Sequence, residues 1–254
     1  DRVGKFLSGN RKGAIMLRSA RQLSSFNLQG IDDDLGKIDD LYFDDAEWEV
    51  RYVVVKTGGW LSEKRVLLSP IALTGGWEDN DVIHVDLTTE QISSSPDIDL
   101  AKPVSRQKEV DLHTHYGWAY YGYGGVGSME KHPPYPRSEE TTDEKIEDPH
   151  LRSLNEVTGY RIQATDDAVG HVEDFIVDDR TWRVRFMVVD TAALWFGKKV
   201  LASPQDIAWV KWADQQVGLH LPKDRVKDLP EWDGSSPMEA DEDESHTRPA
   251  SYVI

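Results

Sequence analysis

The sequence contains no cysteine. This absence excludes disulfide bonds, thiolate nucleophiles and cysteine-ligated metals, and it leaves the redox compartment open. The chain also has no apolar run near the roughly 18 residues that a membrane-spanning helix needs. Its beginning, DRVGKFLSGNRKGAIM, contains no continuous apolar segment of the kind found in signal peptides. We therefore expect a cytoplasmic protein without a transmembrane segment, able to lie at the periphery of a membrane.

Positive charge is scarce. The chain has 29 Lys and Arg residues against 46 Asp and Glu residues, which gives a formal net charge of -17. Such a chain repels nucleic-acid phosphate and anionic lipid head groups unless it carries a local basic patch. The densest basic stretch, around Arg11 and Lys12, is too sparse to form one. We expect no nucleic-acid partner.

Motifs that carry catalysis are also missing. The sequence contains no GxSxG nucleophile elbow, no phosphate-binding Walker loop, no HExxH zinc motif and no EF-hand loop. Paired carboxylates or a Ser, His and Asp set converge only in space, so the sequence leaves them open. We expect a protein that is not an enzyme and that uses no cofactor and no metal.

The chain contains one unit written twice. Its 254 residues, 39% of them hydrophobic, suffice for one large domain or two small ones. Residues 17–93 align without a gap on residues 151–227, and we call these segments the first and second repeats. Two copies of this length favour tandem globular domains over a solenoid. The matched identities include LRS at 17–19 and 151–153, DD at 44–45 and 178–179, and SP at 69–70 and 203–204.

The strongest local pattern is a β-hairpin. FDDAEWEVRYVVV at 43–55 recurs as VDDRTWRVRFMVV at 177–189. After the Trp, aromatic and β-branched residues alternate with others at a period of two, which predicts a strand with one face toward a core. The preceding Asp pair predicts a turn, because short carboxylates hydrogen-bond to their own backbone. Gly36 and Gly170 predict a bulge or tight bend at the start of the first arm.

Further short strands are predicted at 65–68 and 199–202, each stopped by Ser-Pro, and at 82–87 and 217–221. A short helix at TTEQI or PKDRV closes each unit. The predicted fold is mainly β, with two tandem small β-barrels, each with a short C-terminal helix, joined by an aromatic, Gly- and Pro-rich linker. The expected divisions are an N-terminal tail (1–16), domain 1 (17–93), the linker (94–150), domain 2 (151–232) and an acidic disordered tail (233–254).

The order of LRS, Gly, DD-x-x-W-x-V-R, a hydrophobic run and V-L-x-S-P resembles the PRC-barrel domain family in both repeats. That family includes the cytoplasmic domain of the photosynthetic reaction centre H subunit and the C-terminus of a ribosome maturation factor. The resemblance implies a small β-barrel used as a protein-docking module, and an association with a photosynthetic or electron-transfer complex. It implies no catalytic residue. Unlike the H subunit, this chain has two such units and no membrane-spanning helix.

Three sets of residues are candidate partner-binding sites. The predicted hairpin tips KTGGWLSEK and DTAALWFGK carry Trp60 and Leu61, and Leu194, Trp195 and Phe196. Exposed apolar clusters rimmed by charge mark partner sites. The aromatic segment HYGWAYYGYGG adds Tyr116, Trp118, Tyr120 and Tyr121. The alternatives are that the tips fold over an open barrel end or pack the barrels together, and that the aromatic segment lies across one barrel or bridges both.

The acidic residues and the two neighbouring histidines are weak candidates for a metal site. Asp32, Asp33, Asp34, Asp166 and Asp167 could gather a hard cation, but solvation of turns and rims explains them more simply. His113 and His115, two residues apart in an extended chain, would lie on one side and begin a metal site without completing it.

These observations predict a non-enzymatic docking or adaptor protein. It would bind a protein partner, at a membrane complex or through self-association, and two linked units would add weak contacts through effective concentration. The alternative is a cation- or ligand-responsive regulatory or stress protein that binds through its acidic rims.

Overall fold

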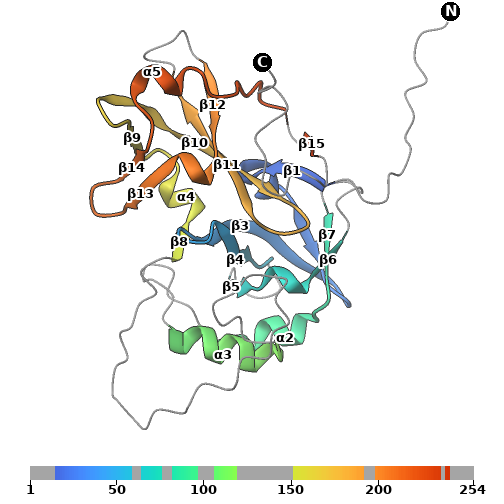
Figure 1. Cartoon of the computed structure of the whole chain (residues 1–254). Helices are drawn as coiled ribbons and strands as arrows, with labels where there is room; N and C mark the ends of the chain where they lie inside the picture. Colours follow the sequence, from blue (N-terminus) through green and yellow to red (C-terminus); the bar gives the residue numbers. More distant parts are fainter. Residues whose placement is uncertain are drawn as a thin grey trace, which may run out of the picture.

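The structure is a computed structural model of the chain, and it describes residues 15–58, 64–75, 82–96, 106–118, 151–191, 198–235 and 238–240. The described residues are mainly β, arranged in two sheets with a few short helices (Figure 1). The first half contains β1 (Ile15–Ser19), α1 (Ala20–Leu23), β2 (Asn27–Gln29), β3 (Asp34–Asp44), β4 (Glu49–Lys56), β5 (Arg65–Leu68), η2 (Pro70–Ala72), β6 (Leu73–Gly75), β7 (Val82–Val85) and α2 (Thr89–Ser93). The second half contains β8 (Leu151–Ser153), α4 (Leu154–Val157), β9 (Arg161–Gln163), β10 (Ala168–Asp178), β11 (Val184–Asp190), β12 (Lys199–Ala202), η3 (Pro204–Asp206), β13 (Ile207–Lys211), β14 (Gln216–Leu219) and α5 (Lys223–Val226). Helix α3 (Arg106–Tyr116) comes between the halves, and β15 (Met238–Ala240) follows them.

The two halves share one topology. The main path of the first sheet runs β5-β4-β3-β2-β7-β6, and that of the second runs β12-β11-β10-β9-β14-β13. In each path one neighbouring pair is parallel, β2 with β7 and β9 with β14, and the other pairs are antiparallel. The repeat in the sequence is therefore also a repeat in strand order.

Both predicted hairpins are confirmed, as β3 with β4 and β10 with β11. Asp44 closes the first turn, where its Oδ1 accepts hydrogen bonds from the backbone N–H groups of Ala46 at 2.9 Å and Glu47 at 3.1 Å. Asp178 Oδ1 accepts the matching pair in the second turn at 3.0 and 2.9 Å. The first Asp of each pair thus caps the turn, as its residue type predicts.

The two predicted glycine bends are also confirmed. Gly36 and Gly170 have φ of 118° and 142°, a region that side chains rarely adopt. A Cβ on Gly36 would lie 2.1 Å from the Lys56 carbonyl oxygen, and one on Gly170 would lie 2.0 Å from that of Asp190. Each glycine therefore lets the first hairpin arm pass close to the end of the second.

The expectation of two closed barrels is wrong for the described strands, since neither sheet closes on itself. In the first sheet the end strands β5 and β6 do not pair with each other. The chain passes from one to the other through the 3-10 turn η2, which begins at Pro70. Proline has no N–H to extend a ladder, so the Ser-Pro step ends the strand and turns a corner instead.

Two segments differ from their predicted character. The expected linker contains α3, where Leu112 and Tyr116 are buried four residues apart on one helix face. The expected disordered tail contains β15, which pairs with β1 through Met238 to Leu17 and Ala240 to Ile15. An open strand edge offers backbone groups to any segment that reaches it, and this pairing needs no apolar pattern.

One hydrophobic core extends through both halves. The rings of Phe43 and Phe175, from β3 and β10, lie 5.7 Å apart between centroids. A smaller separate cluster on the second half contains Leu17, Ile176, Val188 and Leu201. None of the helices in the described part of the chain is long and apolar enough to cross a membrane.

Candidate functional site: the junction between the repeats

The first strand of each repeat belongs to the sheet of the other repeat. Strand β1 pairs with β10, and β8 pairs with β3, both antiparallel (Figure 1). The registers match: Arg18 lies opposite Val177, and Arg152 opposite Phe43. Contacts that recur with the partners exchanged are the mark of a twofold, isologous interface. The junction is therefore a reciprocal strand exchange within one chain.

An ion pair crosses the junction in each direction, and none of the four side chains is more than 15% exposed. Arg18 Nε lies 2.8 Å from Asp179 Oδ2, and Arg152 Nε lies 3.0 Å from Asp45 Oδ2. Burial raises the pKa of Asp179, and the hydrogen bond and charge of Arg18 oppose that rise. The second Asp of each DD turn thus holds the arginine of the exchanged strand.

The serine after each arginine also reaches across. Ser19 Oγ donates to Asp174 Oδ2 at 2.6 Å, and Ser153 Oγ donates to Asp40 Oδ2. Each Ser Oγ also accepts from a backbone N–H in the helix that follows, so it caps α1 or α4. Burial raises the pKa of Asp40, while hydrogen bonds from Ser153 and Asn155 oppose the rise.

The two tryptophans complete the junction through their backbones. The Val50 N–H donates to the Trp182 carbonyl at 2.8 Å, and the Val184 N–H donates to the Trp48 carbonyl at 2.8 Å. Trp48 and Trp182 have φ of 55° and 59°, a left-handed conformation that is uncommon outside glycine. The recurring DD-x-x-W-x-V motif therefore builds the junction as well as the hairpin.

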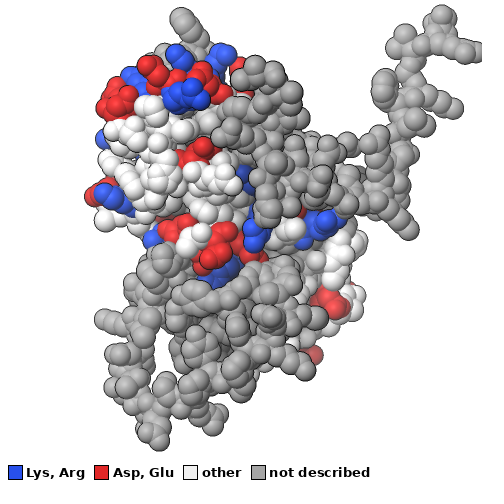
Figure 2. Space-filling model, viewed as in Figure 1, with Lys and Arg blue, Asp and Glu red and all other residues white. Residues whose placement is uncertain are grey.

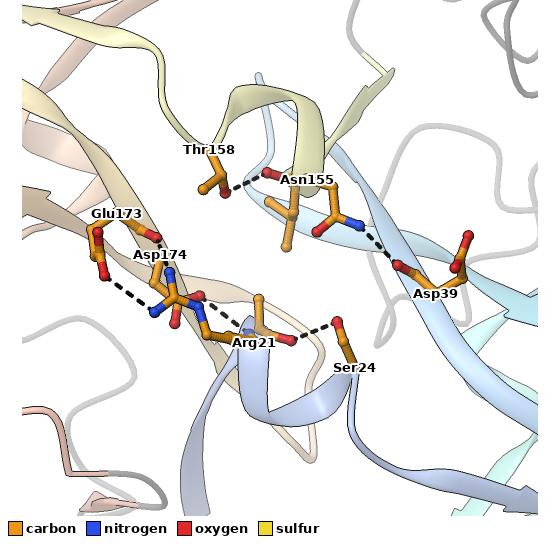
Figure 3. A pocket seen from close by; sticks show the side chains of 9 residues that line it. Arg21, Ser24, Asp39, Asn155, Thr158, Glu173 and Asp174 are labelled. Carbon is orange, nitrogen blue, oxygen red and sulfur yellow. Dashed lines mark hydrogen bonds and ion pairs between the residues drawn. The ribbon is translucent and has the colours of Figure 1, made fainter.

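A cavity of about 180 Å³ lies where α1 and α4 face β3 and β10 (Figure 3). The polar groups that line it form hydrogen bonds with residues of the other repeat. Arg21 Nη1 donates to Glu173 Oε1 at 3.1 Å, and its backbone N–H donates to Asp174 Oδ1 at 3.2 Å. On the opposite wall, Asn155 Nδ2 donates to the Asp39 carbonyl at 2.8 Å. These groups chiefly join the repeats to each other.

Acidic side chains at the start of each hairpin also accept hydrogen bonds from the closing helix of the same repeat. Asp32 accepts hydrogen bonds from the Thr89 backbone N–H at 2.9 Å and from its hydroxyl at 2.7 Å, at the beginning of α2. Asp166 accepts from the Lys223 N–H at 2.8 Å at the beginning of α5. These bonds tie the closing helix of each repeat to its own hairpin, and those from Thr89 lower the pKa of Asp32.

One cluster, which shares Glu173 with the wall of the junction cavity, has the composition of a metal site. His171, Glu173 and Asp190 each offer one ligand atom, and these atoms lie within 4.8 Å of one another. His171 Nε2 lies 3.7 Å from Asp190 Oδ2. The sequence analysis missed this cluster, because the strand that it predicted here began after His171, whereas β10 begins at Ala168 and contains both His171 and Glu173.

Comparison with protein families finds one match, and it covers the first repeat. Residues 19–92 match the PRC-barrel domain family model. This PRC-barrel match runs from the capping serine of α1 to Ile92 in α2, and it does not include the second repeat. No curated protein matches the chain.

Two candidate partner-binding residues, Tyr116 and Trp118, pack against the first repeat, which is the part of the chain that matches the PRC-barrel family. Tyr116 is 8% exposed and its ring stacks on that of Trp118, with centroids 4.3 Å apart. The Trp118 ring meets that of His113 edge-on at 6.0 Å, and His113 does the same with Tyr52 of β4 at 6.4 Å. This part of the aromatic segment therefore lies across one repeat, which was the alternative considered for it. The other candidates, Trp60, Leu61, Tyr120, Tyr121, Leu194, Trp195 and Phe196, lie outside the described residues.

The histidine pair does not converge. His113 and His115 lie on a helix and not on an extended chain, so residues two apart point to different sides. His113 is buried with its Nε2 3.4 Å from the Tyr52 hydroxyl oxygen, and His115 Nε2 lies 2.9 Å from the Gln91 carbonyl oxygen.

Proposed function

We propose that this protein is a non-enzymatic docking module with two PRC-barrel-like units, the second repeat being the second unit. The observation that carries the proposal is the reciprocal strand exchange, which fixes the two units to each other. A family match to a domain type found in protein interactions supports the same conclusion. In this proposal the protein is cytoplasmic and its partner is a protein, at a membrane complex or a second copy of the chain.

The loop that carries the candidate partner-binding residues Trp60 and Leu61, or Leu194 to Phe196, is closed by the same hydrogen bonds in both repeats. The buried Thr57 donates its hydroxyl to the Lys64 carbonyl at 2.8 Å, and the buried Thr191 donates to the Lys198 carbonyl at 2.6 Å. Their backbone N–H groups donate to the same carbonyls at 2.9 and 3.0 Å. Trp60 and Leu61, and Leu194 to Phe196, lie between these closures. The two sequence versions of this loop thus begin and end at matching positions of the framework, and contacts made by both would add through effective concentration.

Surface charge suits a specific protein partner. On the face shown in Figure 2, basic and acidic side chains are interspersed among the described residues. Mixed charge favours complementary polar contacts over general attraction to an anionic polymer or lipid surface. The alternative function, cation sensing through acidic rims, is less well supported because Asp32 and Asp166 already hold the closing helices.

The test is crosslinking in the native cell with the full chain and two variants. The double variant W195S/F196S removes the apolar groups of one loop, and I71S is a matched control because Ile71 is an apolar residue of η2, in the first repeat, that is 52% exposed. We expect the partner to be lost with W195S/F196S and retained with I71S. Equal recovery from both variants would rule out this loop as the docking site, and recovery of the chain alone would assign the contact to self-association.

A further inference from the structure

The two repeats differ sharply at one point of their shared framework. In the first repeat the directly paired residues at the end of the hairpin are Lys37 and Lys56, and in the second they are His171 and Asp190. The residue two positions after the first member is Asp39 or Glu173. Two ammonium groups around a carboxylate have thus been replaced by an imidazole and a second carboxylate on the same strands.

A β-bulge places the third group. Between β10 and β11 the register shifts between Val172 and Asp174, so Glu173 is the extra residue. Bulges re-aim side chains and are common beside functional sites. Val172 points into the core with no exposed surface, while His171 and Glu173 lie on the outer side, and the His171 side chain is 47% exposed. The cluster is therefore assembled by the strand pairing, and solvent reaches it chiefly at His171, because the side chains of Glu173 and Asp190 are only 18% and 16% exposed.

We propose that His171, Glu173 and Asp190 bind a divalent transition metal ion of the Zn²⁺ class. Zinc accepts imidazole nitrogen and carboxylate oxygen at about 2.0–2.2 Å, which puts tetrahedral ligand atoms roughly 3.3–3.5 Å apart. The His171 Nε2 to Asp190 Oδ2 distance of 3.7 Å is close to that value, and the remaining ligand atoms need only side-chain adjustment. Three protein ligands leave a fourth position for water or for a partner's side chain.

The two cationic side chains beside Glu173 contact one of its carboxylate oxygens and leave the other for a metal ion. Lys199 Nζ and Arg21 Nη1 both contact Oε1, at 2.8 and 3.1 Å. They lower the pKa of Glu173, so the carboxylate is ionised at neutral pH, and Oε2 is the oxygen that would face the ion. Their positive charge also weakens cation binding, which is why the imidazole matters. Imidazole nitrogen favours Zn²⁺, Ni²⁺ and Cu²⁺ over the hard ions Mg²⁺ and Ca²⁺.

The first repeat supplies the control substitution. The double variant H171K/D190K places in the second repeat the residues that the first repeat carries at the same paired positions, so the backbone accommodates them. H84Q is the matched control, because His84 is an exposed histidine on β7 of the other sheet. Both variants are first compared with the wild-type chain by thermal unfolding in metal-free buffer to confirm that they fold.

The experiment is a calorimetric titration of the full chain with ZnCl₂, followed by NMR of the histidine side-chain nitrogens. We expect a Zn²⁺ site whose affinity falls at least tenfold in H171K/D190K and is unchanged in H84Q, with the His171 imidazole signals shifting on binding. MgCl₂ and CaCl₂ should not compete at equal concentration. Absence of Zn²⁺ binding, an unchanged titration in H171K/D190K, or unshifted His171 signals would overturn the proposal. Competition by Mg²⁺ or Ca²⁺ at equal concentration would overturn the assigned metal class. None of the three proposed ligands belongs to the docking loop, so W195S/F196S should leave the titration as in the wild type.

Discussion

Trp48 and Trp182 occupy a backbone conformation that costs an ordinary residue roughly 1–2 kcal/mol. Glycine would avoid that cost, but each tryptophan is almost fully buried, and the Trp48 ring lies 5.4 Å from that of Phe43. Burying a ring of this size contributes more than the strain removes. The strained conformation also directs each carbonyl to the other repeat, so the residue serves the turn, the core and the junction at once.

Gly170 should tolerate no side chain. We expect Gly170→Ala to destabilise the protein by at least about 3 kcal/mol, because its φ of 142° is strained for alanine and the Cβ would overlap the Asp190 carbonyl. Gly159→Ala is the matched control, with φ of 91° and no atom within 4 Å of its Cβ, and it should cost only about 1 kcal/mol. Urea unfolding measures both. Equal losses would mean that the close approach of the strands contributes nothing.

Sequence reasoning succeeded where a residue acts locally. The turn-capping role of Asp44 and Asp178 and the bends at Gly36 and Gly170 follow from residue type alone. The left-handed tryptophans were not predicted, because nothing in a Trp side chain favours that conformation. Each tryptophan N–H donates to the carbonyl of Asp44 or Asp178 in its own turn, and each tryptophan carbonyl accepts from Val184 or Val50 across the junction. The second of these contacts is tertiary and has no signal in the sequence.

At the scale of elements, the sequence predicted the strands of each hairpin and the short strands at 65–68, 82–87, 199–202 and 217–221, but not that each LRS segment forms a strand or where that strand pairs. LRS at 17–19 and 151–153 was identified as part of each unit, and the strands at 65–68 and 199–202 were placed to the residue. An internal repeat makes the two sheets equivalent partners, so β1 pairs with β10 by the same side-chain chemistry that would pair it with β3. Strand pattern alone cannot separate these two arrangements.

The Arg18 and Asp179 pair tests the exchanged strand. Arg18→Met should cost about 3 kcal/mol at neutral pH, because it leaves a buried carboxylate without its counter-ion. The pKa of Asp179, already raised by burial, would rise further. A raised carboxyl pKa penalises folding when the group must ionise, so the loss should shrink as the pH falls below that pKa.

Two further variants separate charge from packing at this position. The double variant R18M/D179N should recover most of the loss, and Arg21→Met should cost under about 1 kcal/mol because the Arg21 side chain is 63% exposed. Chemical unfolding at neutral and at mildly acidic pH measures each value. A loss that is the same at both pH values would show that Asp179 does not carry the effect.

Element prediction also failed where covering segments come from outside the repeats. Helix α3 packs its buried Leu112, His113 and Tyr116 against the first repeat, and β15 extends the second sheet. Both lie in stretches whose composition favours a linker or a tail. The signal for α3 was the spacing of Leu112 and Tyr116, which aromatic and glycine content nearby obscured.

For the whole molecule, the repeats are alike inside and different outside. The ion pairs and the serine hydrogen bonds of the junction use the same residue types in both copies, whereas α3 packs on the first repeat and the histidine and carboxylate cluster belongs to the second. The repeated unit and the exchanged strands β1 and β8 give the two halves the same framework, and the residues that differ between the repeats give each half its own surface. Function should therefore be sought in what the copies do not share.

The exchange also predicts how the molecule unfolds. Because each sheet contains a strand of the other repeat and one core spans both, the two repeats should unfold in a single cooperative transition. Leu28→Ala, at a fully buried site in the first repeat, should cost about 2–5 kcal/mol. Hydrogen exchange of the Val55 and Val189 amides, one in each repeat, should report the same loss, and Glu47→Ala in an exposed turn should change neither. If Val189 kept its wild-type protection in Leu28→Ala, the repeats would be independent domains and the exchanged strands would not couple them.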